Sequence, residues 1–312
     1  MLAETYKFQP RYVGAIAETG EVLAGVPTML VESRITGRRM IGLPFSDACP
    51  PLLHGFDRTD ELIGGLLEDY SSQGCAFLEL RGGNSTLATA GFQKFEFVRH
   101  EIPLGASLDE IEGKLSSAKR RARNRATNEG VEVSRSESIA DMKVLYKLYV
   151  LTRQKHGLPP APFSFFENIH RFLIEPGMGC LLVAKWKGQV IAIDLLLWYG
   201  DHLYYKFNVW DTRFQEVRPN DLLIWEAIRL GKEKELSVFD LGRCEIENEG
   251  LRRFKMGWSA NESVLPYYFY PSVRGFTAGA GQKKGHEVAG NVIRRTPPAL
   301  LARAGFLYRH LA

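Results

Sequence analysis

The chain has 312 residues, of which 45% are hydrophobic and 24% charged, with a formal net charge of +4. This size fits one large or two medium globular domains, and the small net charge does not by itself indicate a nucleic-acid partner. Four scattered cysteines, at positions 49, 75, 180 and 244, favour neither a disulfide framework nor a metal site. The start of the chain lacks the pattern of a signal peptide, and its longest apolar stretch, 190–199, is too short to span a bilayer. We therefore expect a cytoplasmic protein, with peripheral contact at the inner face of the membrane as an alternative.

The first hundred residues predict short strands followed by a helix and more strands. The helix carries Ile63, Leu66 and Tyr70 on one face and ends near Gly74. The predicted strands before it cover 12–18, 21–31 and 39–43, and those after it cover 75–80 and 94–101.

A basic helix is predicted over 107–130, where Ser107 and Glu110 form a capping-box pattern. Five cations fall within seven residues: Lys119, Arg120, Arg121, Arg123 and Arg125. A charge run of this kind is often only the solvated face of a connecting helix. Its density favours a phosphate-bearing partner, which is RNA, a nucleotide-linked sugar or an anionic lipid.

The second half repeats the order of the first in a fuller form. It opens with a strand, 131–134, and two helices, 138–156 and 164–173. A three-strand meander, a helix opened by Pro219 and two further strands follow, with the strands at 180–186, 189–199, 202–209, 237–241 and 264–270. Beyond residue 271 we expect a glycine-rich linker, 275–290, and a short helix, 299–311, that docks on the body or lies on a membrane surface.

The most informative motif lies between residues 240 and 258. Asp240, Gly242 and Arg243 end a predicted strand, and a segment Gly-x-x-x-Phe-Lys-x-Gly-Trp then runs from Gly250 to Trp258. This arrangement resembles the closing part of the Fem-type aminoacyltransferases, which belong to the superfamily with the GNAT-type acetyltransferase fold. The resemblance implies an α/β (α+β) protein with two tandem acetyltransferase-like lobes and mixed central sheets, the first lobe being truncated at its N-terminus. We expect a first lobe over 1–105, a basic connecting helix over 106–130, a second lobe over 131–271, and a linker with a C-terminal helix over 272–312.

The resemblance also points to candidate catalytic residues at the end of that strand. It implies that Lys255 neutralises a substrate phosphate or stabilises an oxyanion. The alternative is a lysine whose stem packs along Trp258. Arg243 suits phosphate or carboxylate binding, with Asp240 orienting it, unless the two form a purely structural ion pair.

Candidate substrate-binding residues lie on the meander and beside it. Asp194 interrupts an apolar strand, so it either binds the attacking amine or has a structural partner. Tyr205 and Asn208 follow on the next strand, Arg153 lies near a helix end, and Trp258 flanks the lysine. Core packing of the tyrosine and surface placement of the arginine are the alternatives. The seven histidines show no metal-ligand spacing.

The donor is constrained by the stretch 213–222, which contains no glycine. Coenzyme A-dependent acetyltransferases carry a glycine-rich turn here that holds the pyrophosphate with backbone amides. We therefore expect no tightly bound cofactor and an aminoacyl-tRNA donor, with acyl-coenzyme A as the alternative. The predicted function is transfer of an aminoacyl or acyl group onto a primary amine of a cell-envelope precursor such as a peptidoglycan peptide. Alternatives are an N-acyltransferase that uses acyl-coenzyme A or a carrier protein to modify a sugar amine for exopolysaccharide, and a non-catalytic binding protein.

Overall fold

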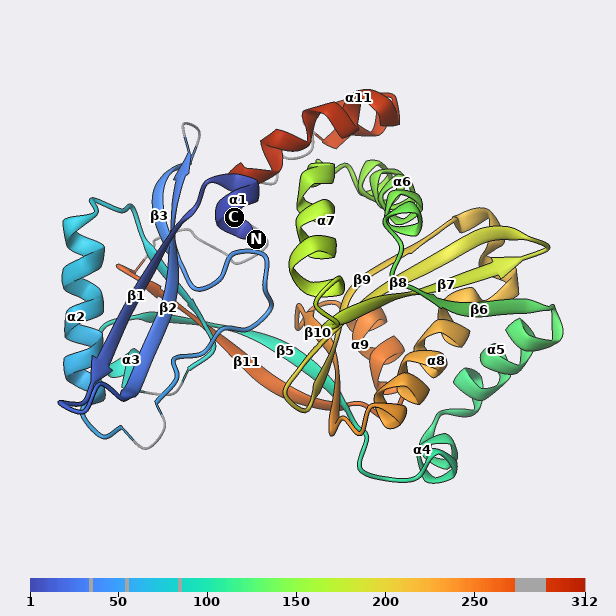
Figure 1. Cartoon of the computed structure of the whole chain (residues 1–312), viewed down its shortest axis with the longest axis horizontal. Helices are drawn as coiled ribbons and strands as arrows, with labels where there is room; N and C mark the ends of the chain where they lie inside the picture. Colours follow the sequence, from blue (N-terminus) through green and yellow to red (C-terminus); the bar gives the residue numbers. More distant parts are fainter. Residues whose placement is uncertain (34–35, 54–55, 84–85, 273–289, 312) are drawn as a thin grey trace. The chain divides into compact units, whose positions relative to one another are not determined.

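The computed structural model describes residues 1–33, 36–53, 56–83, 86–272 and 290–311, which form two compact units (Figure 1). Unit 1 contains residues 98–263 together with 290–306. Unit 2 contains residues 2–97 together with 264–272 and 307–311. The division therefore falls inside two strands, β5 (Gln93–Pro103) and β11 (Asn261–Tyr270).

Unit 2 is a five-stranded sheet in the order β1-β2-β3-β4-β11. The helix α2 covers one face of this sheet, where Leu62 and Leu66 pack against Met40, Leu78 and Leu80. Strand β4 runs parallel to β3 and antiparallel to β11. Its elements before β5 are α1 (Leu2–Tyr6), β1 (Gln9–Ile16), β2 (Val22–Ser33), β3 (Gly37–Ile41), α2 (Thr59–Ser72), β4 (Leu78–Arg81) and α3 (Thr86–Thr89).

Unit 1 is a six-stranded sheet in the order β5-β10-β9-β8-β7-β6. Its strands after β5 are β6 (Val131–Ser136), β7 (Gly179–Trp186), β8 (Gln189–Tyr199), β9 (His202–Trp210) and β10 (Val238–Cys244). Its helices are α4 (Leu108–Lys114), α5 (Ser117–Asn128), α6 (Ile139–His156), α7 (Phe163–Ile169), α8 (Pro219–Glu233), α9 (Glu249–Met256) and α11 (Pro298–Arg303). A π-helical turn, His170–Ile174, and a 3-10 helix, Thr212–Val217, extend two of the connections, and a second 3-10 helix covers Ala304–Leu311.

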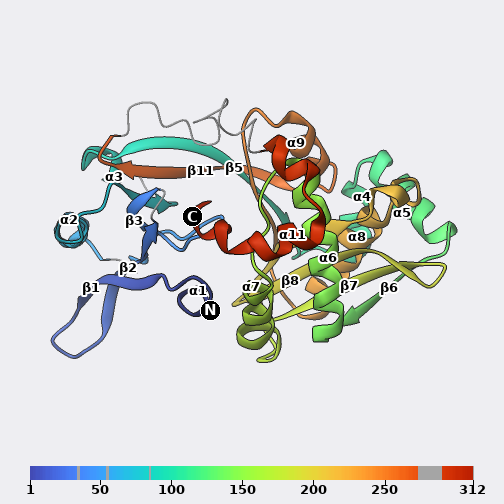
Figure 2. The same ribbon diagram turned by 90° about the horizontal axis from the view of Figure 1, so that it is seen from above.

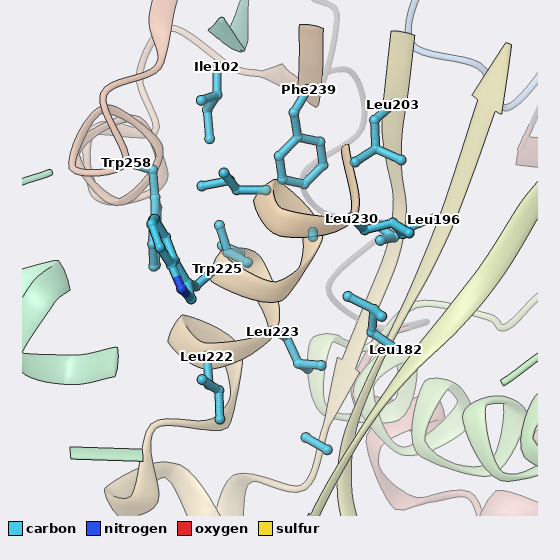
Figure 3. Packing of buried hydrophobic residues seen from close by; sticks show 14 of the residues in the cluster. Ile102, Leu182, Leu196, Leu203, Leu222, Leu223, Trp225, Leu230, Phe239 and Trp258 are labelled. Atoms are coloured by element: carbon cyan, nitrogen blue, oxygen red, sulfur yellow. The ribbon is translucent and has the colours of Figure 1, made fainter. Parts of the chain in front are cut away.

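The two faces of the unit 1 sheet are covered by different helices. Helices α6 and α7 lie on one face and α8 on the other (Figure 1). The apolar face of α8, which includes Leu223 and Leu230, packs on Leu182, Leu203 and Phe239 of the strands (Figure 3). This buried contact fixes the start of α8 against the sheet, which matters for the site described below.

The predicted repeat of meander, helix and strand is confirmed. It appears as β1-β2-β3, α2 and β4 in one half of the chain and as β7-β8-β9, α8 and β10 in the other. The expected lobe boundaries differ from the observed units. The C-terminal part of β5, expected in the first lobe, belongs to unit 1, and most of β11, expected in the second lobe, belongs to unit 2. Strand β5 pairs antiparallel with β10, and β11 pairs antiparallel with β4. A strand's sequence records which of its faces are apolar but not which sheet it joins.

Several local expectations are refined by the structure. The basic segment 107–130 is two helices, because Leu115 is extended and the Ser116 side chain caps α5 by accepting from the Lys119 amide. Helix α9 was not predicted, since the sequence indicated no helix or strand between Arg243 and Trp258. Helix α11 docks along α6 (Figure 2), with Gln154 Nε2 donating to Thr296 O at 2.8 Å.

Most of the glycine-rich segment expected over 275–290 lies outside the described residues. No helix in the described part of the chain has the length and apolar character needed to cross a membrane.

Candidate active site

The sheet of unit 1 opens between β9 and β10. The parallel ladder joining them contains three residue pairs, from Val238 with His202 to Asp240 with Tyr204. Beyond Tyr204, β9 carries one extra residue, Lys206, where the register with β8 shifts. The polar end of β10 thus follows the last paired residue, at an end of parallel strands where open α/β sheets place their ligands.

Asp240 stabilises the backbone conformation at the end of β10. Its carboxylate accepts two hydrogen bonds from the Arg99 guanidinium, at 2.7 and 3.0 Å, and one from the Gly242 amide at 2.7 Å. Gly242 has a φ of +76°, a conformation that glycine adopts without strain. The partner of Asp240 is therefore Arg99 of β5, rather than Arg243 as the sequence suggested. Asp240 is a buried scaffold residue in this arrangement.

Lys255 lies on α9 and points at the same strand end. Its side chain is only 6% exposed, and Nζ donates to Gly242 O at 2.9 Å and to Arg243 O at 3.1 Å. These contacts satisfy two of its three ammonium donors. The structure therefore brings Lys255, Asp240 and the backbone of Arg243 together at the end of β10, with the lysine bound to main-chain oxygens.

A buried histidine beside Lys255 was missed by the sequence reasoning. His100 of β5 is fully buried, and its Nε2 lies 2.9 Å from Glu262 Oε2. Arg252 of α9 binds the same carboxylate at 2.7 and 2.9 Å. Burial, and then the nearby charge of Lys255, lower the pKa of His100. A lone histidine on a strand carries no sequence signal that joins it to a glutamate 162 residues away.

The motif Phe254-Lys255-Met256-Gly257-Trp258 also builds a seat for a second lysine. Lys119 of α5 places Nζ 3.4 Å from the centroid of the Phe254 ring and 5.4 Å from that of Trp258. The same ammonium donates to Asp221 Oδ1 at 2.7 Å. Gly257 makes room for it, because a Cβ there would lie 3.2 Å from Lys119 Cγ. Trp258, a predicted substrate contact, is fully buried beneath this seat.

Next to this seat lies a basic pocket of about 400 Å³. Its charged lining consists of Lys119, Arg121, Arg125, Arg218 and Asp221. Since Asp221 is paired with Lys119, the remaining arginines give the pocket its positive charge. Arg218 precedes α8, and Asp221 occupies the first turn of that helix. A protein carboxylate thus takes the position where a helix N-terminus would otherwise attract a phosphate.

The five predicted polyanion-binding residues do not share one surface. Arg120 donates to Glu112 O and Gly113 O, and Arg123 pairs with Glu112 while stacking over the Trp225 ring. Those two arginines therefore hold α5 against α4, and Arg123 also contacts α8 through Trp225. Lys119, Arg121 and Arg125 line the pocket, where Arg125 also lies 3.5 Å from Glu216.

Asp194 is completely buried, so it cannot touch a substrate amine in this arrangement. Its Oδ1 accepts from Asn208 Nδ2 at 2.7 Å and from the Tyr205 hydroxyl at 3.3 Å. The same Asn208 amide also donates to Asn220 Oδ1, at the start of α8. Burial raises the pKa of Asp194 to about 7, although both hydrogen bonds oppose this shift. The predicted trio Asp194, Tyr205 and Asn208 is therefore one network that supports the first turn of α8.

The remaining candidate, Arg153, lies on α6 away from this network. Its Nε donates to Pro159 O at 3.1 Å, and its guanidinium lies 6.0 Å from the centroid of the Tyr149 ring. Among the described residues, no group of three or more His, Cys, Asp and Glu side chains is placed to hold a metal ion.

Comparisons with known proteins agree with this geometry. Residues 114–257 match the acetyltransferase (GNAT) domain family. The chain is 23% identical over 124 residues to UDP-N-acetylmuramoylpentapeptide-lysine N(6)-alanyltransferase of Weissella viridescens, a match that covers 40% of this chain and 36% of that protein. Among solved structures, FemX matches with a TM-score of 0.69 and 16% identity, covering 85% of this chain and 90% of that one. The C-terminal domain of a putative lysylphosphatidylglycerol synthetase from Agrobacterium fabrum matches with a TM-score of 0.59 and 16% identity, covering 86% and 85%.

Residues 114–257 are thus similar to a GNAT acetyltransferase domain, and the chain shares the fold of FemX over most of its length. The sequence match spans about a third of the curated relative's length.

Proposed function

We propose that the protein transfers an aminoacyl group from aminoacyl-tRNA to a primary amine of a cell-envelope precursor. The observation that carries this proposal is the basic pocket at the start of α8, which is lined by arginine side chains. Side-chain cations suit the phosphodiester backbone of RNA, whereas coenzyme A-dependent enzymes rely on a backbone amide cradle. The name of the curated relative, an alanyltransferase that acts on a peptidoglycan precursor, supports the same reaction class.

The reaction requires no nucleophile from the protein. The amine of the acceptor attacks the ester carbonyl, a C–N bond forms, and the C–O bond to the ribose breaks. The amine proton is transferred, in net terms, to the departing ribose oxygen. The protein contributes by positioning the two substrates and by stabilising the oxyanion. Lys255 supplies a positive charge at the end of β10 for that purpose.

The position of Asp221 favours tRNA over acyl-coenzyme A as donor. Its carboxylate occupies the first turn of α8 and is bound to Lys119. A pyrophosphate at this helix terminus would meet a negative charge. Acyl-coenzyme A or a carrier protein donating to a sugar amine is the second candidate. A third candidate is non-catalytic binding. The positive charge of Lys255 at the strand end favours an enzyme over a binding protein.

A transfer assay tests the proposal. Purified protein is incubated with radiolabelled aminoacyl-tRNA and a muramyl-pentapeptide precursor, and in parallel with labelled acetyl-coenzyme A. We expect label on the precursor amine from tRNA only, and weak or undetectable coenzyme A binding by calorimetry. Micromolar coenzyme A binding in unit 1, with transfer from acetyl-coenzyme A, would instead establish the second candidate.

Because the precursors of this reaction are made inside the cell, we propose that the protein acts in the cytoplasm, near the inner face of the membrane. This location is part of the proposal. Fractionation of cells expressing the tagged chain, with and without added salt, distinguishes a free cytoplasmic protein from a peripheral one.

A further inference from the structure

Arg39 in unit 2 is a buried cation with two donor nitrogens that lack partners among the described residues. It lies on β3, and its side chain is 6% exposed. In the part of the chain that the structure describes, Nε and Nη2 have no hydrogen-bond partner. The Phe77 ring, 6.0 Å from the guanidinium carbon, is its aromatic neighbour. Buried guanidinium groups are normally paired, because removing their donors from water without replacement is costly.

Two acidic side chains on the strands that flank β3 are already paired with other arginines. Glu79 binds Arg81 at 2.6 Å, and Glu32 binds Arg38 at 2.6 Å. Burial lowers the pKa of Arg39, and the charge of Glu79 offsets this only in part. The protein therefore leaves the Arg39 charge largely uncompensated.

A second arginine with an unused donor lies in the same region. Arg309 donates from Nη2 to Glu32 O at 3.2 Å, while its buried Nε has no hydrogen-bond partner among the described residues. The His310 ring binds Ser33 through Nδ1 at 2.7 Å. The β2–β3 ladder places Arg39 opposite Val31, next to the Glu32 carbonyl that Arg309 binds. Burial, and then the charges of Arg309 and Arg39, lower the pKa of His310.

We propose that unit 2 binds an oxyanion, a phosphate or carboxylate group, at Arg39 and Arg309. Planar guanidinium groups bind such oxygens with paired, charge-assisted hydrogen bonds, and the donors that lack partners here are of that kind. This site is separate from the basic pocket of unit 1 and does not depend on the proposed transfer reaction. A bound oxyanion satisfies the donors and offsets the buried charge at the same time.

Phosphate titration tests the site. Inorganic phosphate and, separately, acetate are titrated into the full chain by calorimetry in chloride buffer of matched ionic strength. The chain carries Arg121→Gln and Arg218→Gln, so that the unit 1 pocket contributes little. We expect saturable binding that weakens at least about tenfold in Arg39→Met and in Arg309→Met. Arg38→Met, which alters an exposed neighbour already paired with Glu32, should bind like the parent.

The ligand class and the alternative explanation are separated by the same experiment. Binding of phosphate alone identifies a phosphate site, and binding of acetate with equal strength identifies a carboxylate site. In chloride, Arg39→Met should melt at the same or a higher temperature than the parent, because an uncompensated buried charge is replaced by an apolar side chain. Equal anion binding in the parent and Arg39→Met, or a parent that binds neither anion, would overturn the proposal. Loss of folding in Arg39→Met with unchanged binding in Arg309→Met would overturn it as well.

Discussion

The ammonium group of Lys255 is buried, and it binds the carbonyl oxygens of Gly242 and Arg243. It therefore supports the bulged end of β10 in addition to supplying charge. The sequence motif singled out this lysine, but its contacts with main-chain atoms leave no trace in the sequence. A substitution should consequently change both folding stability and activity.

We predict that Lys255→Met lowers turnover by about 100-fold or more, the usual effect of removing one oxyanion-stabilising group. The free energy of unfolding should fall by about 1–3 kcal/mol, because two buried carbonyl oxygens lose their donor. Arg253→Met, on the same helix but exposed, is the matched control and should alter neither quantity. Steady-state kinetics and urea unfolding measure the two effects. A stable variant with unchanged turnover would remove Lys255 from the mechanism.

Asp194 makes folding stability depend on pH. Its pKa is raised by burial to about 7 in the folded protein, above the ordinary 3.8. A raised carboxyl pKa means that the folded state holds the proton more tightly than the unfolded state. The stabilising contribution is therefore fully present below pH 4 and is lost as pH rises through about 7.

Asp194→Asn mimics the protonated carboxyl and should remove this dependence. We expect the variant to match the parent below about pH 4 and to exceed its free energy of unfolding at pH 8–9 by a few kcal/mol. Asp211→Asn, at the cap of a 3-10 helix, is a control whose carboxyl pKa is lowered and so has the opposite sign. Parallel stability curves for Asp194→Asn and the parent between pH 5 and 9 would show that Asp194 remains ionised.

At the scale of elements, α5 and α9 meet at Gly257. The Ser116 amide, just before α5, donates to Gly257 O at 3.1 Å, and the stem of Lys119 passes over the same residue. A Cβ at Gly257 would lie 3.2 Å from Lys119 Cγ and 3.3 Å from Ser116 Oγ. The glycine of the motif thus lies at a close approach between two helices, where a larger residue would press on Lys119 and Ser116.

We predict that Gly257→Ala displaces Lys119 and weakens donor binding more than it weakens folding. A tight contact with a flexible side chain should lower the free energy of unfolding by about 1 kcal/mol. The control is Gly113→Ala on α4, where a Cβ meets nothing within 4 Å and helix propensity improves. Thermal unfolding and tRNA binding are measured for both. Equal tRNA affinity for Gly257→Ala and the parent would show that the seat of Lys119 does not contribute to the pocket.

The elements themselves were largely predictable, and their partners were not. Alternating apolar residues gave the meander strands, and β8 (Gln189–Tyr199) has the predicted bounds. Helix α9 was not predicted from the sequence because its first turn is polar and it is only eight residues long. The pairing of Lys119 with Asp221 joins residues 102 positions apart, and the exchange of β5 and β11 depends on which sheet edge is open. Neither the ion pair nor the placement of these two strands can be predicted from the local sequence pattern.

A net charge of +4 does not indicate whether the protein binds RNA. RNA binding depends on where the cations lie on the folded chain. The charge run on α5 was predicted to bind a phosphate-bearing partner. The structure divides it between residues that fasten the helix, Arg120 and Arg123, and residues that line the pocket. Arg218, which lies outside the run, joins the pocket through folding.

The salt dependence of tRNA binding tests this division. Each lost phosphate contact should flatten the plot of log affinity against log salt by about 0.7 to 0.9. We predict that the combined variant Arg121→Gln, Arg125→Gln, Arg218→Gln reduces the slope by roughly two to three units with little change in stability. The double variant Arg120→Gln, Arg123→Gln should leave the slope near the parental value, because those guanidinium groups bind α4. Identical slopes for the two variants would show that the pocket is not where RNA binds. A parent chain without RNA affinity at low salt would leave an acyl-coenzyme A or carrier-protein donor as the remaining candidate.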